Sequence, residues 1–382
     1  MRDADAQTQW GGSMKQPGTW LAAMLLLFAP ALEAQGSGPV DSLRRVAQMA
    51  PLFVSHDVLD VRIVAPLATI LADRSQDSEY HPGTLTYVND RGDAIVLDIR
   101  AKTRGHFRLQ PRICDFPSLH LNFEREQVEQ TLFAGQNRIA IVTHCRDDES
   151  DFEQFALQEY LIYRSLNELT DRSVRVRLAR ATYVDTDGER DSLTRYMFIL
   201  EPFEMVAARH GWTILEVPAV PPSEHDPFGL PLVEVFQFLI GNTDWSPFEK
   251  STDGDCCHNG KLIGTMAGPV YLVPYDFDWS GVISAPYAKP APEIGVRHVR
   301  QRRYWGICRP AEEFVPVFER FNDRRQAIYA LWRAQEGLEP GRLERTLDYF
   351  DEFYEIINND RRARYEIVTQ CRDMSYLEDH VR

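Results

Sequence analysis

The spacing of the apolar residues changes at residue 152, and this change constrains the fold more than any other feature. Between about residues 52 and 145, short apolar alternations are separated by Gly and Pro, a pattern typical of β-strands. From residue 152 to residue 169 the apolar residues recur at helical spacing. Two more strand-like segments follow, and the remainder is mainly helical. This order differs from the regular alternation of strand and helix in a doubly wound sheet.

The predicted elements are short strands in the first half and longer helices in the second. Turn residues at 89–92 predict a hairpin between two of the strands. The strands are expected at 58–64, 83–88, 94–100, 119–123, 138–142, 174–178 and 196–201, and the helices at 152–169, 232–240, 311–334 and 340–370.

The net charge limits the partners of this chain. Its 382 residues include 57 acids and 42 bases, which gives a formal net charge of −15. Such a surface repels phosphate backbones, so no nucleic-acid partner is expected. The length is sufficient for a substantial hydrophobic core.

The N-terminal segment resembles an export signal. Lys15 precedes an apolar stretch at 20–32, and Ala34 is a small residue suited to the position before a cleavage site. We therefore expect a signal peptide at residues 1–34, with residues 1–13 reflecting a misplaced start before Met14. An uncleaved anchor is the alternative. No later segment is apolar enough to cross a bilayer, so the protein is expected to be periplasmic or extracellular, with no transmembrane span after signal cleavage.

The cysteines favour disulfide bonds. An even number in an exported chain is typical of disulfides rather than free thiols, and the sequence leaves their pairing open. Metal binding by Cys256, Cys257 and His258 is the alternative, although adjacent cysteines rarely chelate one tetrahedral ion. The cysteines are Cys114, Cys145, Cys256, Cys257, Cys308 and Cys371.

Two strongly apolar runs are followed by acidic residues. The run 235–240 precedes Asp244, and the run 270–273 precedes Asp276 and Asp278. A buried element that is followed by a carboxylate can deliver it to a cleft, where oxygen ligands suit Mg²⁺ or Mn²⁺. The simpler alternative is that Asp244 is a turn residue without chemistry, and that Asp276 and Asp278 cap a turn or pair with Arg297 or Arg300.

Two more polar residues complete the candidate set. Asn259 lies between the two acidic stretches, and Glu159 lies on the first long predicted helix. Phosphoryl transfer needs an acid that orients the attacking hydroxyl, metal ligands, and a basic residue that pairs with phosphate. Glu159 could equally be an ordinary helix residue.

Six short segments, taken in order, resemble the spore coat protein H (CotH) kinase-like family. The similarity spans roughly residues 55–335, and the Asp-x-Asp after an apolar strand is its most specific part. The segments are 104–108, 114–117, 158–161, 241–244, 258–259 and 275–278.

The resemblance implies a fold and an activity. The implied fold is α+β and two-lobed, like that of protein kinases, with a β-rich N-terminal lobe and a mainly helical C-terminal lobe. The implied activity is transfer of a phosphoryl group from ATP or another nucleotide to a protein hydroxyl, with Mg²⁺ or Mn²⁺. The acceptor protein is unknown.

The resemblance also implies roles for individual residues. Asp244 would be the catalytic acid, and Asn259 with Asp276 or Asp278 would be the metal ligands. Arg104 would lie near the nucleotide phosphates, with Glu159 as the ion-pairing residue of the helix.

The chain departs from the family pattern in two places. The loop between Asp244 and Asn259 is long and contains two cysteines, and no glycine-rich phosphate loop is recognisable. Lys102 and Arg138 are both candidates for the basic residue that pairs with phosphate. A catalytically inactive binding protein of the cell envelope is therefore the alternative function. A metal-dependent hydrolase is a third, without an HExxH pattern to support it.

The expected organisation has four parts. After the signal peptide at 1–34 comes a leader at 35–54. A β-rich lobe with one long helix is expected at 55–205, and a helical lobe with the catalytic-type and metal-type loops at 206–382.

Overall fold

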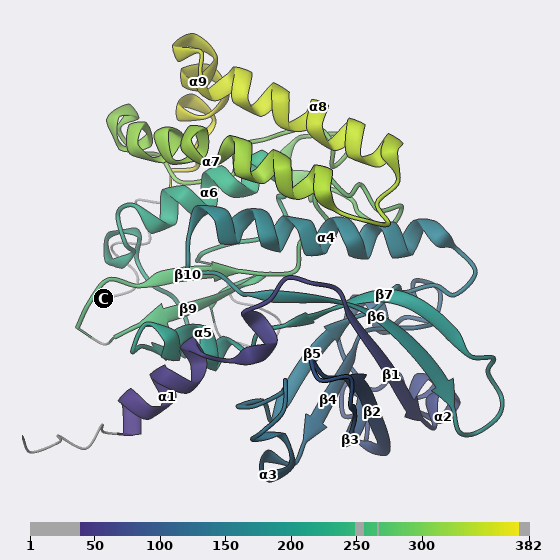
Figure 1. Ribbon diagram of the computed structural model, residues 1–382. Coiled ribbons are helices and arrows are strands. Elements are labelled where there is room, and N and C mark those ends of the chain that lie inside the picture. The colour runs from purple at the N-terminus through teal and green to yellow at the C-terminus, as the bar shows by residue number, and fades with distance from the viewer. Residues whose placement is uncertain (1–38, 249–255, 266, 374–382) are drawn as a thin grey trace, which may run out of the picture. The chain divides into compact units, whose positions relative to one another are not determined.

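The alternating strands of the first half close into a barrel (Figure 1). The computed structural model describes residues 39–248, 256–265 and 267–373. In this part of the chain seven strands follow the order β1-β2-β3-β4-β5-β7-β6. They are β1 (Leu59–Ala65), β2 (His81–Val88), β3 (Ala94–Thr103), β4 (Leu119–Phe123), β5 (Arg138–Val142), β6 (Val176–Asp185) and β7 (Leu193–Leu200).

The parallel pairing of β1 with β6 closes the barrel. β1 is antiparallel to β2 on one side, with Ile63 opposite Leu85, and parallel to β6 on the other, with Ile63 opposite Tyr183. Alternate residues of these strands point inward and are buried, because side chains alternate between the two faces of a strand. Their packed interior forms one of the hydrophobic cores.

The prediction of a two-lobed protein-kinase-like fold is wrong. The structure contains a closed barrel of seven strands with mixed directions, whereas the N-terminal lobe of a kinase contains a small sheet. The closing contact joins residues about 120 positions apart in sequence, such as Leu59 and Ala179. Local periodicity identifies strands but carries no information on such long-range pairing, so the sequence could not distinguish an open sheet from a barrel.

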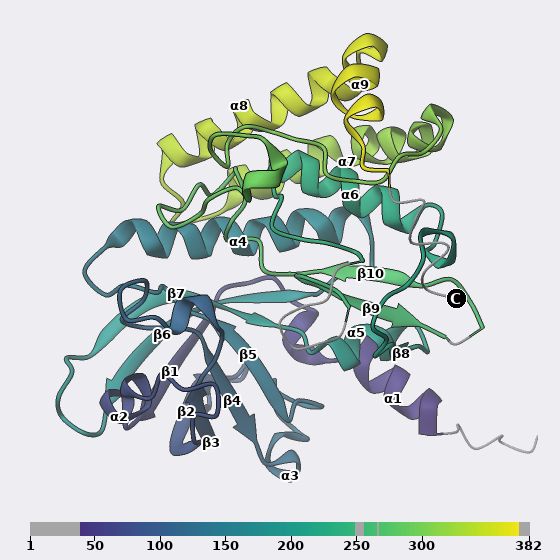
Figure 2. The ribbon, with the colours of Figure 1, turned by 180° about the vertical axis from the view of Figure 1, so that it is seen from behind.

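The helices lie mainly in the second half of the chain, and a small sheet with the order β10-β9-β8 accompanies them (Figure 2). Its strands are β8 (Thr213–Ile214), β9 (Gly260–Gly264) and β10 (Tyr271–Pro274). The α-helices are α1 (Pro39–Gln48), α2 (Leu67–Ala72), α3 (Arg125–Val128), α4 (Ser150–Leu169), α5 (Phe203–Arg209), α6 (Gly229–Ile240), α7 (Val315–Ala334), α8 (Pro340–Ile357) and α9 (Asp360–Glu366). Single 3₁₀ turns occur at Pro51–Phe53, Phe107–Leu109, Pro222–Glu224, Pro292–Ile294, Ala311–Phe314 and Val368–Gln370.

Helix α4 is the central element of the second core. Figures 1 and 2 show it between the barrel strands and helices α7 and α8. It is buried on nearly every face, as expected for a helix with neighbours on all sides. The indole nitrogen of the fully buried Trp332 on α7 donates to the Ser165 hydroxyl at 2.9 Å. The same burial applies to Glu159, which therefore needs a partner.

The predicted strands and long helices lie close to the observed ones, and the disulfides are confirmed. The pairs are Cys114–Cys145, Cys256–Cys257 and Cys308–Cys371. The short helices α2, α3 and α5 and strand β9 escaped prediction because their apolar patterns are too short to show a period.

Two predictions concern the ends of the chain and membrane spans. The predicted signal peptide at 1–34 lies outside the described residues. The described part of the predicted leader contains α1 and the turn Pro51–Phe53. Within the described ranges, no helix combines the length and the apolar character needed to traverse a bilayer.

Candidate functional site

A buried ion-pair network joins the barrel to α4 and to the segment after β10. Arg108 lies in the connection between β3 and β4, and its Nη2 is 2.9 Å from Glu159 Oε2 on α4. The same nitrogen is 2.8 Å from Asp278 Oδ2, which also accepts from the Tyr287 hydroxyl at 2.8 Å. The side chains of Arg108, Glu159 and Asp278 are only 14%, 2% and 6% exposed. One guanidinium therefore pairs with two carboxylates that are almost inaccessible to bulk water.

Burial controls the charge states in this network. Removal from water would lower the pKa of Arg108, but Asp278, Tyr287 and Glu159 raise it overall, so the guanidinium stays charged. Burial, and then the nearby Asp278, raise the pKa of the Glu159 carboxyl, although Arg108 opposes this change. The network consequently depends on Arg108 for its balance of charge.

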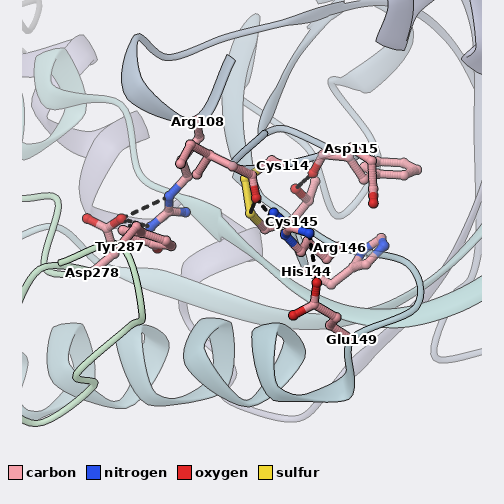
Figure 3. The surroundings of a disulfide bond; sticks show 12 residues. Arg108, Cys114, Asp115, His144, Cys145, Arg146, Glu149, Asp278 and Tyr287 are labelled. Carbon is pink, nitrogen blue, oxygen red and sulfur yellow. Dashed lines mark hydrogen bonds and ion pairs between the residues drawn. A yellow bond between two sulfur atoms is a disulfide. The ribbon is translucent and has the colours of Figure 1, made fainter. Parts of the chain in front are cut away.

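A disulfide supports the segment that carries Arg108 (Figure 3). Cys114 lies in the same β3–β4 connection, and its partner Cys145 lies between β5 and α4. Arg146 Nε donates to the carbonyl of Ile113 at 2.8 Å, and Phe116 N–H donates to the carbonyl of Cys145 at 2.9 Å. These contacts hold the segment against the start of α4, the helix that carries Glu159.

Asp276 lies beside this network in a small recess of about 80 Å³. Its backbone has φ +62°, in the left-handed region, and its N–H donates to the Tyr163 hydroxyl at 2.9 Å. The carboxylate is exposed to the recess, but the surrounding protein and the neighbouring Asp278 raise its pKa well above the usual value. Arg104 lines the same recess, and burial lowers its pKa while Asp276 opposes that effect.

Asp244 is held by two residues of the loop that precedes β9. His258 Nε2 lies 2.9 Å from Asp244 Oδ1, and the Asn259 amide nitrogen donates to Asp244 Oδ2 at 3.0 Å. The same amide nitrogen donates to the Asp244 carbonyl at 2.7 Å. Asn259 also accepts from Tyr275 N–H through its backbone carbonyl at 3.0 Å, so this loop connects Asp244 to the segment of Asp276.

A glycine C-cap directs the chain from α6 to Asp244. Gly241 ends the helix in the left-handed region with φ +66°. A Cβ at this position would lie 2.1 Å from the Tyr349 hydroxyl, so no other residue fits unless the buried Tyr349 side chain moves. The Asn242 side chain then accepts from Asp244 N–H at 3.0 Å and fixes the turn. This local geometry explains how the chain passes from the buried helix α6 to the half-exposed carboxylate of Asp244.

A large cavity adjoins the recess. It has a volume of about 800 Å³ and shares Arg104, Leu200 and Tyr275 with the wall of the recess. Its basic lining residues are Arg104, His120, Arg125, Arg138 and Lys261.

The bases at the barrel end of this cavity surround His120, and the cavity is also lined by Glu201, Glu204 and Glu216. Burial lowers the pKa of His120 to about 3, and the charges of Arg104, Arg138 and Lys102 lower it in the same direction. The three cations near His120 would also stabilise a bound anion. A third cavity of about 250 Å³ is lined by Asp244 and Trp279, and Trp279 also lines the recess.

The site has some but not all of the ligands that a divalent cation needs. Asp276 faces the recess, and the Asn259 amide nitrogen is used by Asp244, which leaves the Asn259 side-chain oxygen as an acceptor. Asp278 is already bound by Arg108 and Tyr287. Among the described residues, no group of three or more His, Cys, Asp or Glu is arranged to hold a metal alone. Mg²⁺ commonly uses one or two carboxylates and completes its shell with phosphate and water, and the residues present fit that mode.

The structure brings the predicted site residues into two connected groups. Glu159, Arg104, Asp276 and Asp278 line one recess, whereas Asp244 and Asn259 bind each other beside it. The alternative pairing of Asp278 with Arg297 or Arg300 is wrong, because Asp278 binds Arg108.

Sequence reasoning missed the role of Arg108. The residue stands in the quoted segment 104–108, four positions after Arg104, and it is the basic partner of the helix glutamate. Of the two bases considered instead, Arg138 lines the large cavity. Lys102 Nζ donates to the Ser78 carbonyl at 3.0 Å and lies over the Tyr80 ring. The spacing of an arginine from a buried helix acid cannot be read from sequence.

Neither the models of known protein families nor the curated proteins compared with this chain give a match. The resemblance to the CotH kinase-like family therefore stays a prediction from the residues.

Proposed function

We propose that the protein is a phosphotransferase that moves a phosphoryl group from a nucleotide to a protein hydroxyl, with a divalent metal. The observation that carries this proposal is the shared wall between a basic cavity of about 800 Å³ and a recess lined by carboxylates. The cavity volume lies within the usual range for cofactor-sized ligands. The proposal rests on the chemistry of this site and does not depend on a kinase fold.

The basic cavity suits the nucleotide. Arg104 lies on the wall between cavity and recess, so it can pair with the phosphates at the point where they enter the recess. Arg138 and Lys261 extend the positive surface along the cavity. The charges of Arg104, Arg138 and Lys102, which add to burial in lowering the pKa of His120, would favour a polyphosphate.

Asp276 and the Asn259 side-chain oxygen are the residues that would hold the metal. A bound Mg²⁺ or Mn²⁺ would neutralise charge on the transferring phosphoryl group. Arg108 pairs with both Glu159 and Asp278 and so offsets part of the negative charge beside Asp276, which leaves Asp276 as the carboxylate available to a metal–nucleotide complex.

Asp244 suits the orientation of the acceptor hydroxyl. The hydroxyl oxygen would bond to the terminal phosphorus of the nucleotide as the bond from that phosphorus to the bridging oxygen breaks. The hydroxyl proton would pass to Asp244, whose carboxylate is held by His258 and Asn259. The cavity of about 250 Å³ that is lined by Asp244 shares Trp279 with the recess, so it could receive an acceptor.

Nucleotide binding tests this proposal. We expect ATP with Mg²⁺ or Mn²⁺ to raise the melting temperature by ~5 °C when the nucleotide is present at about one hundred times its dissociation constant. Asp276→Asn should abolish the metal-dependent part of the shift, whereas the exposed control Asp348→Asn should retain it. No shift with any nucleotide and metal would reject the proposal.

One observation favours a second candidate, a binding protein without catalysis. Asp278 was one of the expected metal ligands, yet its carboxylate is occupied by Arg108 and Tyr287. A chain that binds nucleotide and never transfers phosphoryl groups would support this candidate over the first.

We also propose that this function is performed outside the cytoplasm. The three disulfides and the predicted signal at residues 1–34 support a periplasmic or extracellular location. Non-reducing mass mapping of the protein from its native cells should recover the three bridges, and six free thiols there would contradict the location.

A further inference from the structure

A cavity of about 520 Å³ lies apart from the proposed nucleotide and acceptor cavities. It is bounded by the first turns of α4, by the segment 282–286 that follows Asp278, and by the start of α8. Figure 1 shows α8 running above α4. Three arginines line it: Arg300, Arg342 and Arg345.

Two of these arginines lack a carboxylate partner among the described residues. Arg300 Nη1 donates to the Gly281 carbonyl at 3.3 Å, and its guanidinium lies 5.1 Å from the centre of the Tyr349 ring. Arg345 is exposed on α8, with neither an ion pair nor a hydrogen bond in the part of the chain that the structure describes. Their positive charges are therefore available to a ligand.

The acids that line the cavity are already neutralised. Asp151 Oδ1 binds Arg342 Nη2 at 2.7 Å, and Arg342 also binds Glu339 at 3.2 Å. Glu149 binds Arg146 at 2.7 Å. Because Arg342 is shared by two acids, these groups together leave one net positive charge, and Arg300 and Arg345 are the arginines of the cavity without a carboxylate partner among the described residues.

We infer that this cavity is a binding site for a phosphate-class dianion. Guanidinium groups bind such oxyanions through charge-assisted, often paired hydrogen bonds. Ser284 lines the same cavity and is half-buried, so its hydroxyl can contribute a further donor. The cavity is larger than inorganic phosphate, so it also has room for a phosphate carried on a peptide side chain, which has the same chemistry.

The site is connected to the proposed catalytic network through Gln158. Its amide nitrogen donates to the Val282 carbonyl at 3.3 Å, and its oxygen accepts from Arg342 at 3.5 Å. Gln158 directly precedes Glu159, the partner of Arg108. A dianion here would bridge α4, α8 and the segment after Asp278. The inference concerns binding alone and stands whether or not phosphoryl transfer occurs.

Calorimetric titration tests the inference with two probes. One is inorganic phosphate, and the other is a phosphoserine peptide with its unphosphorylated form as reference. We expect Arg345→Ala to weaken binding at least tenfold, because it removes a charge-assisted contact. Arg345→Lys should lose less, and Asp151→Asn should strengthen binding by releasing Arg342.

Two control variants separate this site from the basic cavity. Arg138→Ala changes the nucleotide cavity and should leave binding at the new site intact, and the exposed Arg364→Ala should change nothing. If the phosphopeptide binds more tightly than inorganic phosphate, the ligand is a phosphate carried on a peptide. If inorganic phosphate binds as tightly or more tightly, the ligand is free phosphate. Either result supports the inference if Arg345→Ala weakens the measured binding. Absence of binding by both probes, or loss in Arg138→Ala but not in Arg345→Ala, would overturn it.

Discussion

Replacement of Arg108 by methionine should unbalance the buried network. The variant keeps an unbranched apolar side chain but leaves the carboxylates of Glu159 and Asp278 without a cation. Both are nearly inaccessible to water, at 2% and 6% exposure. Loss of one partner from such a buried network typically lowers the free energy of unfolding by about 3–5 kcal/mol. We expect a loss of that size at pH 8, measured by guanidinium denaturation followed by tryptophan fluorescence.

The loss should shrink as the pH falls. Burial and Asp278 already raise the pKa of Glu159 above its usual value of 4.5, and Arg108 opposes this rise, so its removal raises the pKa further. The folded variant then binds a proton that the unfolded chain does not, in the window above pH 4.5. Its unfolding free energy therefore decreases as the pH rises through that window and recovers on acidification.

Two controls accompany this measurement. Arg108→Met with Glu159→Gln removes one of the two competing acids and should recover part of the stability at pH 8. Arg180→Met breaks an exposed ion pair with Asp60 and should have no measurable effect. A loss below about 1 kcal/mol at pH 8, or an equal loss at pH 5.5 and pH 8, would refute the reasoning.

Three further predictions follow from individual contacts. Cys308→Ala with Cys371→Ala should lower the free energy of unfolding by about 4 kcal/mol in denaturant titrations, because that disulfide spans a sequence separation of 63; an unchanged midpoint would contradict this estimate. Gly241→Ala should cost about 2–4 kcal/mol in the same assay, because its φ is +66° and its new Cβ would lie 2.1 Å from a buried tyrosine hydroxyl. Arg138→Ala should raise the pKa of His120 from about 3 toward its usual value, as followed by NMR titration; an unmoved titration would show that the charge of Arg138 does not contribute.

The secondary structure was largely predictable because its signals are local. The alternation in 94–100 and the helical spacing in 152–169 each depend on neighbouring residues, and β3 and α4 occupy those positions. Barrel closure was not predictable, since it depends on β1 pairing with β6 across about 120 residues. The periodicity of a segment indicates that it forms a strand, but it does not indicate which other strands pair with it.

The candidate site was predictable in part for the same reason. Carboxylates that follow apolar runs were visible in sequence, and Asp244 and Asp276 do lie beside cavities. The residues that bind these site carboxylates could not be identified from the sequence. Arg108 reaches Glu159 across 51 positions and Asp278 across 170, and only the tertiary structure selects it over Lys102.

Phosphoryl transfer itself tests the central claim most directly. The mature protein would be incubated with ATP, Mn²⁺ and a mixture of candidate acceptor proteins, with transfer followed by intact-mass spectrometry and by radiolabel on the acceptors. We predict labelled hydroxyl groups with the wild type and a loss of at least 10²-fold in rate with Asp244→Asn, which retains the fold but cannot take the proton. A rate unchanged in Asp244→Asn, or no transfer by a wild-type protein that binds the metal–nucleotide complex, would contradict the proposed reaction.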